Sequence, residues 1–250
     1  MVDTLRFMSG RRARLERKAV ENSGHELGII ATAERMLAVD FSGVAATHTR
    51  QVLVGWMRHA FEQSRVIARL NLAGLGHAAA PNRRSFYETL VRILWLDGVD
   101  QADRAGTVDA MLAEDKKHVS KEADALRALG LDSDVDLEEM ESVVLNVTSV
   151  GHLKDQARVF LHAAKASEIP TVGLYKGWRQ ETQYSHATAV LGGAYAPNYD
   201  DRIGMGRPPQ ADADLESLWM ATALVGAMTM QLLKDEGVSM ADELWAAFFA

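Results

Sequence analysis

The sequence predicts an all-α protein, a single helical bundle of about eight or nine helices that spans residues 1–250 as one domain. Two observations lead to this fold class. Apolar residues recur at the 3.6-residue spacing of amphipathic helices, and no segment shows a convincing strand pattern or a repeat of fixed period. With 250 residues, 48% of them hydrophobic, the chain is long enough to bury a substantial core.

The first part of the chain predicts three helices. Two of them cover residues 11–39 and 47 to about 73, and His59 falls on the apolar side of the second, where we expect a hydrogen-bonded core histidine. The third should begin at Ser85 and end near residue 96, because Ser85 and Glu88 match a capping box. Glu88 and Arg92 are four residues apart in this helix and can form an ion pair.

The rest of the chain predicts six further helices and one long loop. Residues 142–150 are the best candidate for a strand, but their length fits a short buried helix equally well. The loop over residues 196–212 contains three prolines, and a loop of this length is typical of a mobile lid or a partner contact. The six helices are expected over residues 99–129, 137–147, 153–166, 171–195, 215–233 and 239–250.

Composition and missing motifs exclude several classes of function. The chain has no cysteine, so disulfides, thiolate zinc sites and a cysteine nucleophile are excluded. It also lacks the sequence motifs of zinc, di-iron, P-loop and dinucleotide sites, so we expect no metal or other cofactor. No segment has the roughly 20 apolar residues of a membrane-spanning helix, and we expect a soluble cytoplasmic protein without a membrane partner.

The formal net charge of −7 argues against a protein that coats nucleic acid without specificity. The charge is unevenly distributed, because a basic N-terminal helix expected over about residues 1–20 carries six basic side chains against two acidic ones. Such a helix could be an arm for RNA, DNA or an acidic partner, although a solvated helix face is the commoner explanation of a short charge run.

Side chains that can take part in acid–base chemistry or bind a polar ligand are most concentrated in residues 171–195. If this segment is one helix, Tyr175, Arg179 and His186 share a face with Thr182 or Gln183, because seven residues make almost two turns. A polar stripe of this kind in a hydrophobic chain predicts either a buried hydrogen-bonded network or a functional site.

The pattern Arg179-x6-His186 resembles the motif of the HEPN superfamily of small all-α bundles. Nuclease members of that superfamily carry Arg-x(4 to 6)-His on a late helix and act as dimers. The residue after the arginine is commonly Asn, Asp or His in these nucleases, and it is Gln180 in this chain. The chain is also similar to uncharacterised bacterial helical proteins that have a helix with Glu and Arg, here Glu88 and Arg92, before a late helix rich in Tyr, Ser and His, here Tyr184 to His186.

The resemblance covers two helices and implies metal-independent cleavage of RNA. His186 would act as general base or acid, and Arg179 would hold the charge of the pentavalent phosphorus. Tyr184 or Gln180 would orient the phosphate, and two copies of the chain would complete the site. Further contacts to the substrate are expected from Tyr175, Glu88 and Arg92.

Two other functions are compatible with the same residues. The first is a non-catalytic interaction or oligomerisation module that presents the loop over residues 196–212 and an apolar C-terminal helix, through which a homodimer could form. That helix ends in Leu244, Trp245, Phe248 and Phe249. The second is an enzyme acting on a small molecule, for which Tyr175, Arg179, His186 and Glu88 would line an enclosed pocket.

Overall fold

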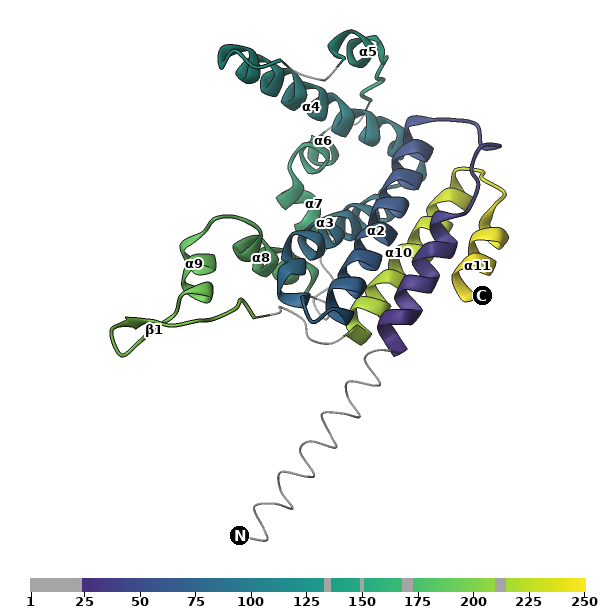
Figure 1. Cartoon of the computed structure of the whole chain (residues 1–250). Helices are drawn as coiled ribbons and strands as arrows, with labels where there is room; N and C mark the ends of the chain where they lie inside the picture. The colour runs from purple at the N-terminus through teal and green to yellow at the C-terminus, as the bar shows by residue number, and fades with distance from the viewer. Residues whose placement is uncertain (1–23, 133–135, 149–150, 168–172, 210–214) are drawn as a thin grey trace.

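The computed structural model describes residues 24–132, 136–148, 151–167, 173–209 and 215–250 (Figure 1). The all-α prediction is confirmed, because these residues form eleven α-helices, one short 3-10 helix and a single two-stranded hairpin. The count of eight or nine helices was too low. The basic segment over residues 1–20 lies outside the described residues.

The helices follow one another along the chain, and the hairpin lies between α9 and α10. Residues 24–37 form the first described helix. It is followed by α2 (His48–Leu72), the 3-10 helix η1 (Gly76–Ala79), α3 (Ala80–Asp97), α4 (Gln101–Ala128), α5 (Leu137–Ser142), α6 (Gly151–Arg158), α7 (Phe160–Ala166), α8 (Leu174–Ser185), α9 (Ala189–Tyr195), β1 (Asn198–Tyr199), β2 (Arg202–Ile203), α10 (Leu215–Asp235) and α11 (Ala241–Phe249).

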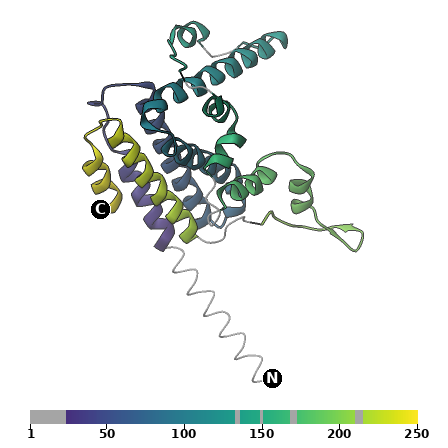
Figure 2. The ribbon, with the colours of Figure 1, turned by 180° about the vertical axis from the view of Figure 1, so that it is seen from behind.

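The core lies between the helix over residues 24–37, α2, α3 and α10, which pack side by side (Figure 1, Figure 2). Each contributes one apolar stripe, as the helical spacing of its sequence predicts. The largest fully buried side chains are Ile29, Met36, Leu53, Met57, Phe61, Ile67, Phe86, Leu90, Ile93, Leu96, Leu232 and Leu233.

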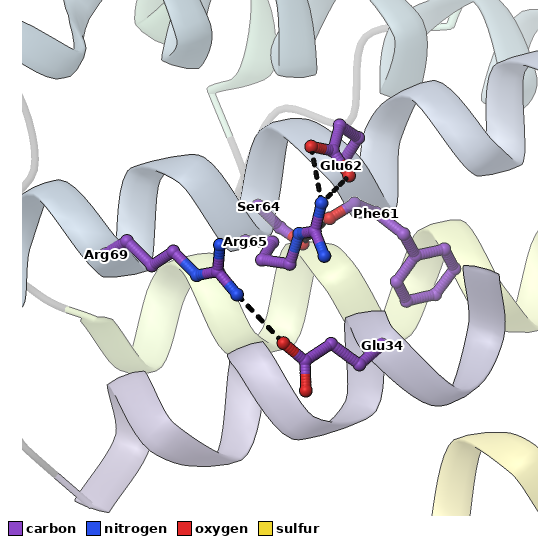
Figure 3. A network of polar contacts seen from close by, with 6 residues as sticks. All are labelled: Glu34, Phe61, Glu62, Ser64, Arg65 and Arg69. Carbon is purple, nitrogen blue, oxygen red and sulfur yellow. Dashed lines mark hydrogen bonds and ion pairs between the residues drawn. The ribbon is translucent and has the colours of Figure 1, made fainter. Parts of the chain in front are cut away.

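Ion pairs line the outer edge of this core (Figure 3). Arg69 of α2 donates to Glu34 of the helix over residues 24–37 at 2.9 Å, and Arg65 donates to both carboxylate oxygens of Glu62. Phe61 points from the same stretch of α2 into the core. Because exposed pairs contribute only about 0–1 kcal/mol each, the buried apolar side chains, and not these charges, hold the two helices together.

The C-terminal helix α11 docks on its own chain. Phe248 is buried, its ring stacks on Trp219 of α10, and its edge meets Phe61 of α2. Arg35 donates to the last carbonyl oxygens of α11, those of Ala247 and Phe248, which have no partner within the helix. This part of the apolar C-terminal end therefore packs on the fold of its own chain.

Two of the predicted helices are each broken into two. Val159 adopts an extended conformation between α6 and α7, where one helix over residues 153–166 was expected. The expected helix over residues 171–195 ends at Ser185, and His186 is extended. Thr188 causes the second break, because its hydroxyl accepts from the Leu191 amide to cap α9 and donates to the Gln183 carbonyl.

The start of α3 also differs from the prediction. The helix begins at Ala80 with a proline in its first turn, a favoured position for that residue, so Ser85 lies inside the helix and not at a cap. The capping-box interpretation was therefore wrong. Ser85 Oγ instead lies 2.7 Å from Nε2 of His59, which is exposed and not the core histidine that we expected.

Two further segments differ from their predicted structure. Residues 143–148 are neither helix nor strand, and the expected helix over 137–147 ends at Ser142. The predicted loop over residues 196–212 contains an antiparallel hairpin in its described part, in which Asn198 pairs with Ile203. Asp200 and Asp201 both have positive φ at its turn, a conformation that Asp tolerates better than most residues.

An arm formed by α9 and the hairpin extends from α8 away from the other helices (Figure 1, Figure 2). The outer part of α4 likewise projects from the bundle together with α5. No helix among the described residues is long and apolar enough to cross a membrane.

Candidate functional site: the face between α3 and α8

The predicted site residues of the 171–195 segment are placed by the packing of α8 on α3. Leu174 of α8 and Phe86 of α3 are buried in this contact. Gly177 lies over the ring of Tyr87, which is only 3.4 Å from the position that a Cβ would take. The missing side chain therefore lets α8 approach α3 closely.

A buried ion pair ties the two helices together. Arg83 of α3 donates through Nε to Oε1 of Glu181 on α8 at 2.7 Å, and through Nη1 to the Gly76 carbonyl. Glu181 is completely buried. Removing either partner would leave the other charge buried without its counterion, so the pair fixes the register of α8 on α3.

Next to this pair, the exposed face carries an arginine in contact with a histidine. Arg84 Nη1 lies 2.9 Å from Nε2 of His186, and the Arg84 guanidinium lies 5.9 Å from the centre of the Trp178 ring. Because a guanidinium only donates hydrogen bonds, Nε2 must be the acceptor, which places the imidazole proton on Nδ1. The contact with Arg84 therefore fits the tautomer of His186 that carries its proton on Nδ1.

Arg179 lies near the same tryptophan but is not bonded to His186. Its guanidinium is exposed and lies 6.0 Å from the centre of the Trp178 ring. The imidazole of His186 is also exposed, so this face is an open surface and not an enclosed cavity around the two residues. The partner of His186 in the structure is Arg84, whereas the sequence motif pointed to Arg179.

The other predicted residues of α8 surround Trp178 or face the solvent. Tyr175 is half-buried, and its ring stacks on Trp178 at 5.8 Å between centroids. Gln180 is exposed, and Tyr184 is half-buried. The face therefore alternates cations with aromatic rings.

Glu88 and Arg92 form no direct salt bridge, although the Glu88 carboxylate still acts on the Arg92 charge through space. Glu88 accepts a hydrogen bond from Trp178 Nε1 at 3.3 Å, so it belongs to the α3–α8 face. Arg92 donates to the carbonyl oxygens of Gln156 and Ala157 and lies over the rings of Trp95 and Phe160, and the Phe160 ring in turn packs on Trp178. Burial there lowers the pKa of Arg92 from its usual value, although nearby carboxylates oppose the shift.

Two residues of this face were missed by sequence reasoning. Neither Trp178 nor Arg84 was among the predicted site residues. The contact of Arg84 with His186 spans 102 positions of sequence, and no local pattern reports it. The sequence did contain one indication of this site, the adjacent arginines Arg83 and Arg84 on a helix with an apolar face. Neighbouring residues of a helix point in different directions, so one of the two side chains can lie against another helix while the other faces the solvent.

No group of three or more metal-ligating side chains comes together among the described residues. No known family matches the chain, and no match is found among curated proteins or among solved structures.

Proposed function

We propose that the chain is a metal-independent, HEPN-like ribonuclease whose substrate lies on the α3–α8 face. The observation that carries the proposal is the contact of 2.9 Å between Arg84 Nη1 and His186 Nε2 on an exposed surface beside Trp178. Cleavage of a phosphodiester without a metal needs a general base and a group that stabilises the charge on phosphorus. An imidazole of defined tautomer next to a cation provides both.

The order of events follows from the hydrogen-bonding capacities of the two side chains. A bound phosphate competes for the donors of Arg84, because a guanidinium prefers a bidentate anionic acceptor to a neutral imidazole. Movement of Arg84 onto the phosphate frees Nε2 of His186. That nitrogen then takes the proton of the ribose 2′-hydroxyl while the 2′-oxygen bonds to phosphorus. The bond from phosphorus to the 5′-oxygen breaks, the 5′-oxygen takes up a proton from water, and the imidazolium returns its proton to the solvent.

The neighbouring side chains supply binding. Arg179 is exposed and available to a second phosphate, and Gln180 lies beside it on the same turn of α8. Trp178 and Tyr175 present aromatic surface between these cations. Aromatic rings interleaved with cations suit single-stranded RNA, because bases stack on the rings while the backbone follows the charges. A cytoplasmic location would give such a site access to RNA.

The test is cleavage of a labelled single-stranded RNA in the presence of EDTA. The same oligonucleotide with 2′-deoxyribose at every position should bind but remain intact, because the nucleophile is missing. His186→Ala should lower the cleavage rate by about a hundredfold or more, the usual contribution of a general base. Arg84→Ala and Arg179→Ala should weaken binding as well as cleavage.

Two control variants test whether the loss of any exposed histidine or arginine would have the same effect. His118→Ala and Arg127→Ala remove one exposed histidine and one exposed arginine of α4, far along the chain from the proposed site. Both controls should cleave like the wild type. A wild-type protein that leaves RNA intact, or a His186→Ala variant that cuts as fast, would refute the proposal.

An interaction module is the second candidate, because α11 and the segment that follows the hairpin are among the places where apolar side chains remain uncovered. Trp245 and Phe249 of α11 are 52% and 63% exposed, and Ile203 and Met205 of the arm are 86% and 97% exposed. If α11 forms a homodimer, Trp245→Glu with Phe249→Glu should halve the mass measured by light scattering. A mass equal to that of one chain in the wild type would exclude this dimer.

A further inference from the structure

A second candidate site lies where the beginning of α2 meets α4, and no residue of α8 belongs to it. A pocket of about 520 Å³ opens there. Its lining combines one imidazole, two carboxylates, two hydroxyls and an amide. These belong to His48, Asp109, Glu236, Thr47, Thr49 and Gln51.

The pocket contains a histidine oriented by a carboxylate. His48 Nδ1 lies 2.6 Å from Oδ1 of Asp109, and Oδ2 of Asp109 accepts the Asn146 backbone amide at 2.6 Å. Asp109 is nearly buried, while about a third of the His48 side chain remains accessible. Both oxygens of the carboxylate are thus fixed, so the ring of His48 is held from one side and open on the other.

This arrangement sets the tautomer of the imidazole. Because the Asp109 carboxylate accepts hydrogen bonds, Nδ1 of His48 carries the proton, and the lone pair of Nε2 is left on the other edge of the ring. No described residue forms a hydrogen bond with Nε2. By contrast, His118 lies 3.7 Å from Glu114 on the open surface and does not line this pocket.

We infer that His48 and Asp109 form a general-base site that accepts a small neutral or cationic polar molecule. The chemical class follows from the lining. Neither lysine nor arginine is among the described residues that line the pocket, and Glu236 adds a second carboxylate. Arg50 is close in sequence, but its guanidinium is engaged with the carbonyl oxygens of Ala45 and Glu236. An anionic substrate such as a phosphate ester is therefore disfavoured, in contrast to the α3–α8 face.

The simplest reaction at such a site is hydrolysis of a neutral ester. Nε2 of His48 takes a proton from a water molecule as the water oxygen bonds to the acyl carbon. The bond to the leaving oxygen then breaks, and the proton passes from Nε2 to that oxygen. Asp109 stabilises the imidazolium that exists between the two transfers, and it does not itself take the proton.

The test uses p-nitrophenyl acetate as a neutral probe and p-nitrophenyl phosphate as its anionic counterpart, with the full chain. The wild type should hydrolyse the acetate and leave the phosphate. His48→Ala should lower the rate with the acetate by about tenfold or more, since general-base catalysis contributes about a hundredfold at a dedicated substrate. His118→Ala is the matched control, because it removes a histidine beside a carboxylate outside the pocket, and its rate should equal that of the wild type.

Asp109→Asn tests the mechanism without relying on a deletion. An asparagine amide can donate to Nδ1 of His48 and so moves the ring proton to Nε2, which removes the base although the ring remains. We expect loss of esterase activity together with a change of the His48 tautomer, read from its ¹⁵N chemical shifts. Circular dichroism establishes that the variant is folded.

Three results would overturn the inference. The first is equal rates for the wild type and His48→Ala. The second is faster turnover of the phosphate than of the acetate. The third is a ¹⁵N spectrum of the wild type in which Nε2 carries the proton. None of these results bears on cleavage of RNA by His186, so this site and the proposed ribonuclease site succeed or fail separately.

Discussion

Arg83 on α3 and Glu181 on α8 form a buried ion pair at 2.7 Å, although 98 positions of sequence separate them. Arg84, the residue after Arg83, makes the exposed contact with His186. The buried pair fixes the position of α8 on α3. The contact between Arg84 and His186 at the surface therefore depends on it.

Glu181→Ala should destabilise the protein by about 3–5 kcal/mol, since it leaves the buried guanidinium of Arg83 without its counterion. Urea unfolding followed by circular dichroism measures the change. The double variant Arg83→Met with Glu181→Leu is the matched control, because it removes both charges and fills their space. It should be clearly more stable than Glu181→Ala, and equal losses in the two variants would contradict this explanation.

Phe248→Ala should cost about 3–5 kcal/mol, because it opens a cavity between Phe61 and Trp219. Phe249→Ala removes the neighbouring ring of the same helix, which is 63% exposed, and should cost much less. Chemical denaturation of the two variants gives the comparison. Similar midpoints would show that α11 does not dock through Phe248.

The pair of Arg104 and Asp235 predicts a pH-dependent part of the stability. The hydrogen bond from Arg104 at 2.8 Å, helped by one from Gln231, lowers the pKa of Asp235 below its usual value against the opposing effect of burial. A carboxylate whose pKa is lower in the folded protein contributes stability above its unfolded pKa of about 3.9 and loses that contribution as the pH falls through the folded value.

Asp235→Asn should therefore lower the free energy of unfolding by about 2 kcal/mol at pH 7, as expected for a hydrogen bond to a charged group. The difference from the wild type should shrink between pH 4 and pH 2. Urea unfolding at several pH values measures it. A difference that stays constant over this range would mean that the ion pair makes no contribution.

The arm offers a test of local structure. A side chain at Gly206 would meet the carbonyl oxygen of Ala194 and the ring of Pro197, so Gly206→Ala should break the contact between the Gly206 amide and the Tyr195 carbonyl. Amide exchange should then rise in β1 and β2. The free energy of unfolding should stay within about 0.5 kcal/mol of the wild type, as for other changes away from the core. Met205→Ala, one residue earlier and almost fully exposed, should leave the exchange unchanged.

RNA binding to the α3–α8 face should depend on salt. Each cation that contacts a phosphate of a single strand contributes about 0.7 to the slope of log K against log salt concentration. Arg179→Ala should lower this slope by about that amount, whereas Arg127→Ala should not, because Arg127 pairs with Asp124 on α4. An unchanged slope for Arg179→Ala would remove that residue from the interface.

Helical periodicity was sufficient for the fold class and for the position of most helices, because an amphipathic stripe is a property of the local sequence. It did not predict the breaks. Val159 interrupts one helix by adopting an extended backbone conformation, and Thr188 interrupts another by capping the helix that follows it. Neither residue type excludes a helix by itself. The hairpin at Asp200 was missed because its strands are only two residues long.

The site was predicted in part. Residues of α8 could be placed on one surface from their spacing, and Tyr175, Arg179 and His186 do lie along that helix or at its end. The partner of His186 could not be found in this way, because Arg84 reaches it from α3. The same is true of His48 and Asp109, which only the packing of α2 on α4 brings together.

The position of α10 against α2 and α3 has a consequence for synthesis of the chain. While the ribosome is still translating the middle of the message, the apolar stripe of α2 is covered only in part, because α3 follows α2 directly and α10 comes much later in the sequence. The nascent chain must keep Leu53, Met57 and Phe61 from self-association until α10 emerges. Completion of the bundle therefore waits for the synthesis of α10.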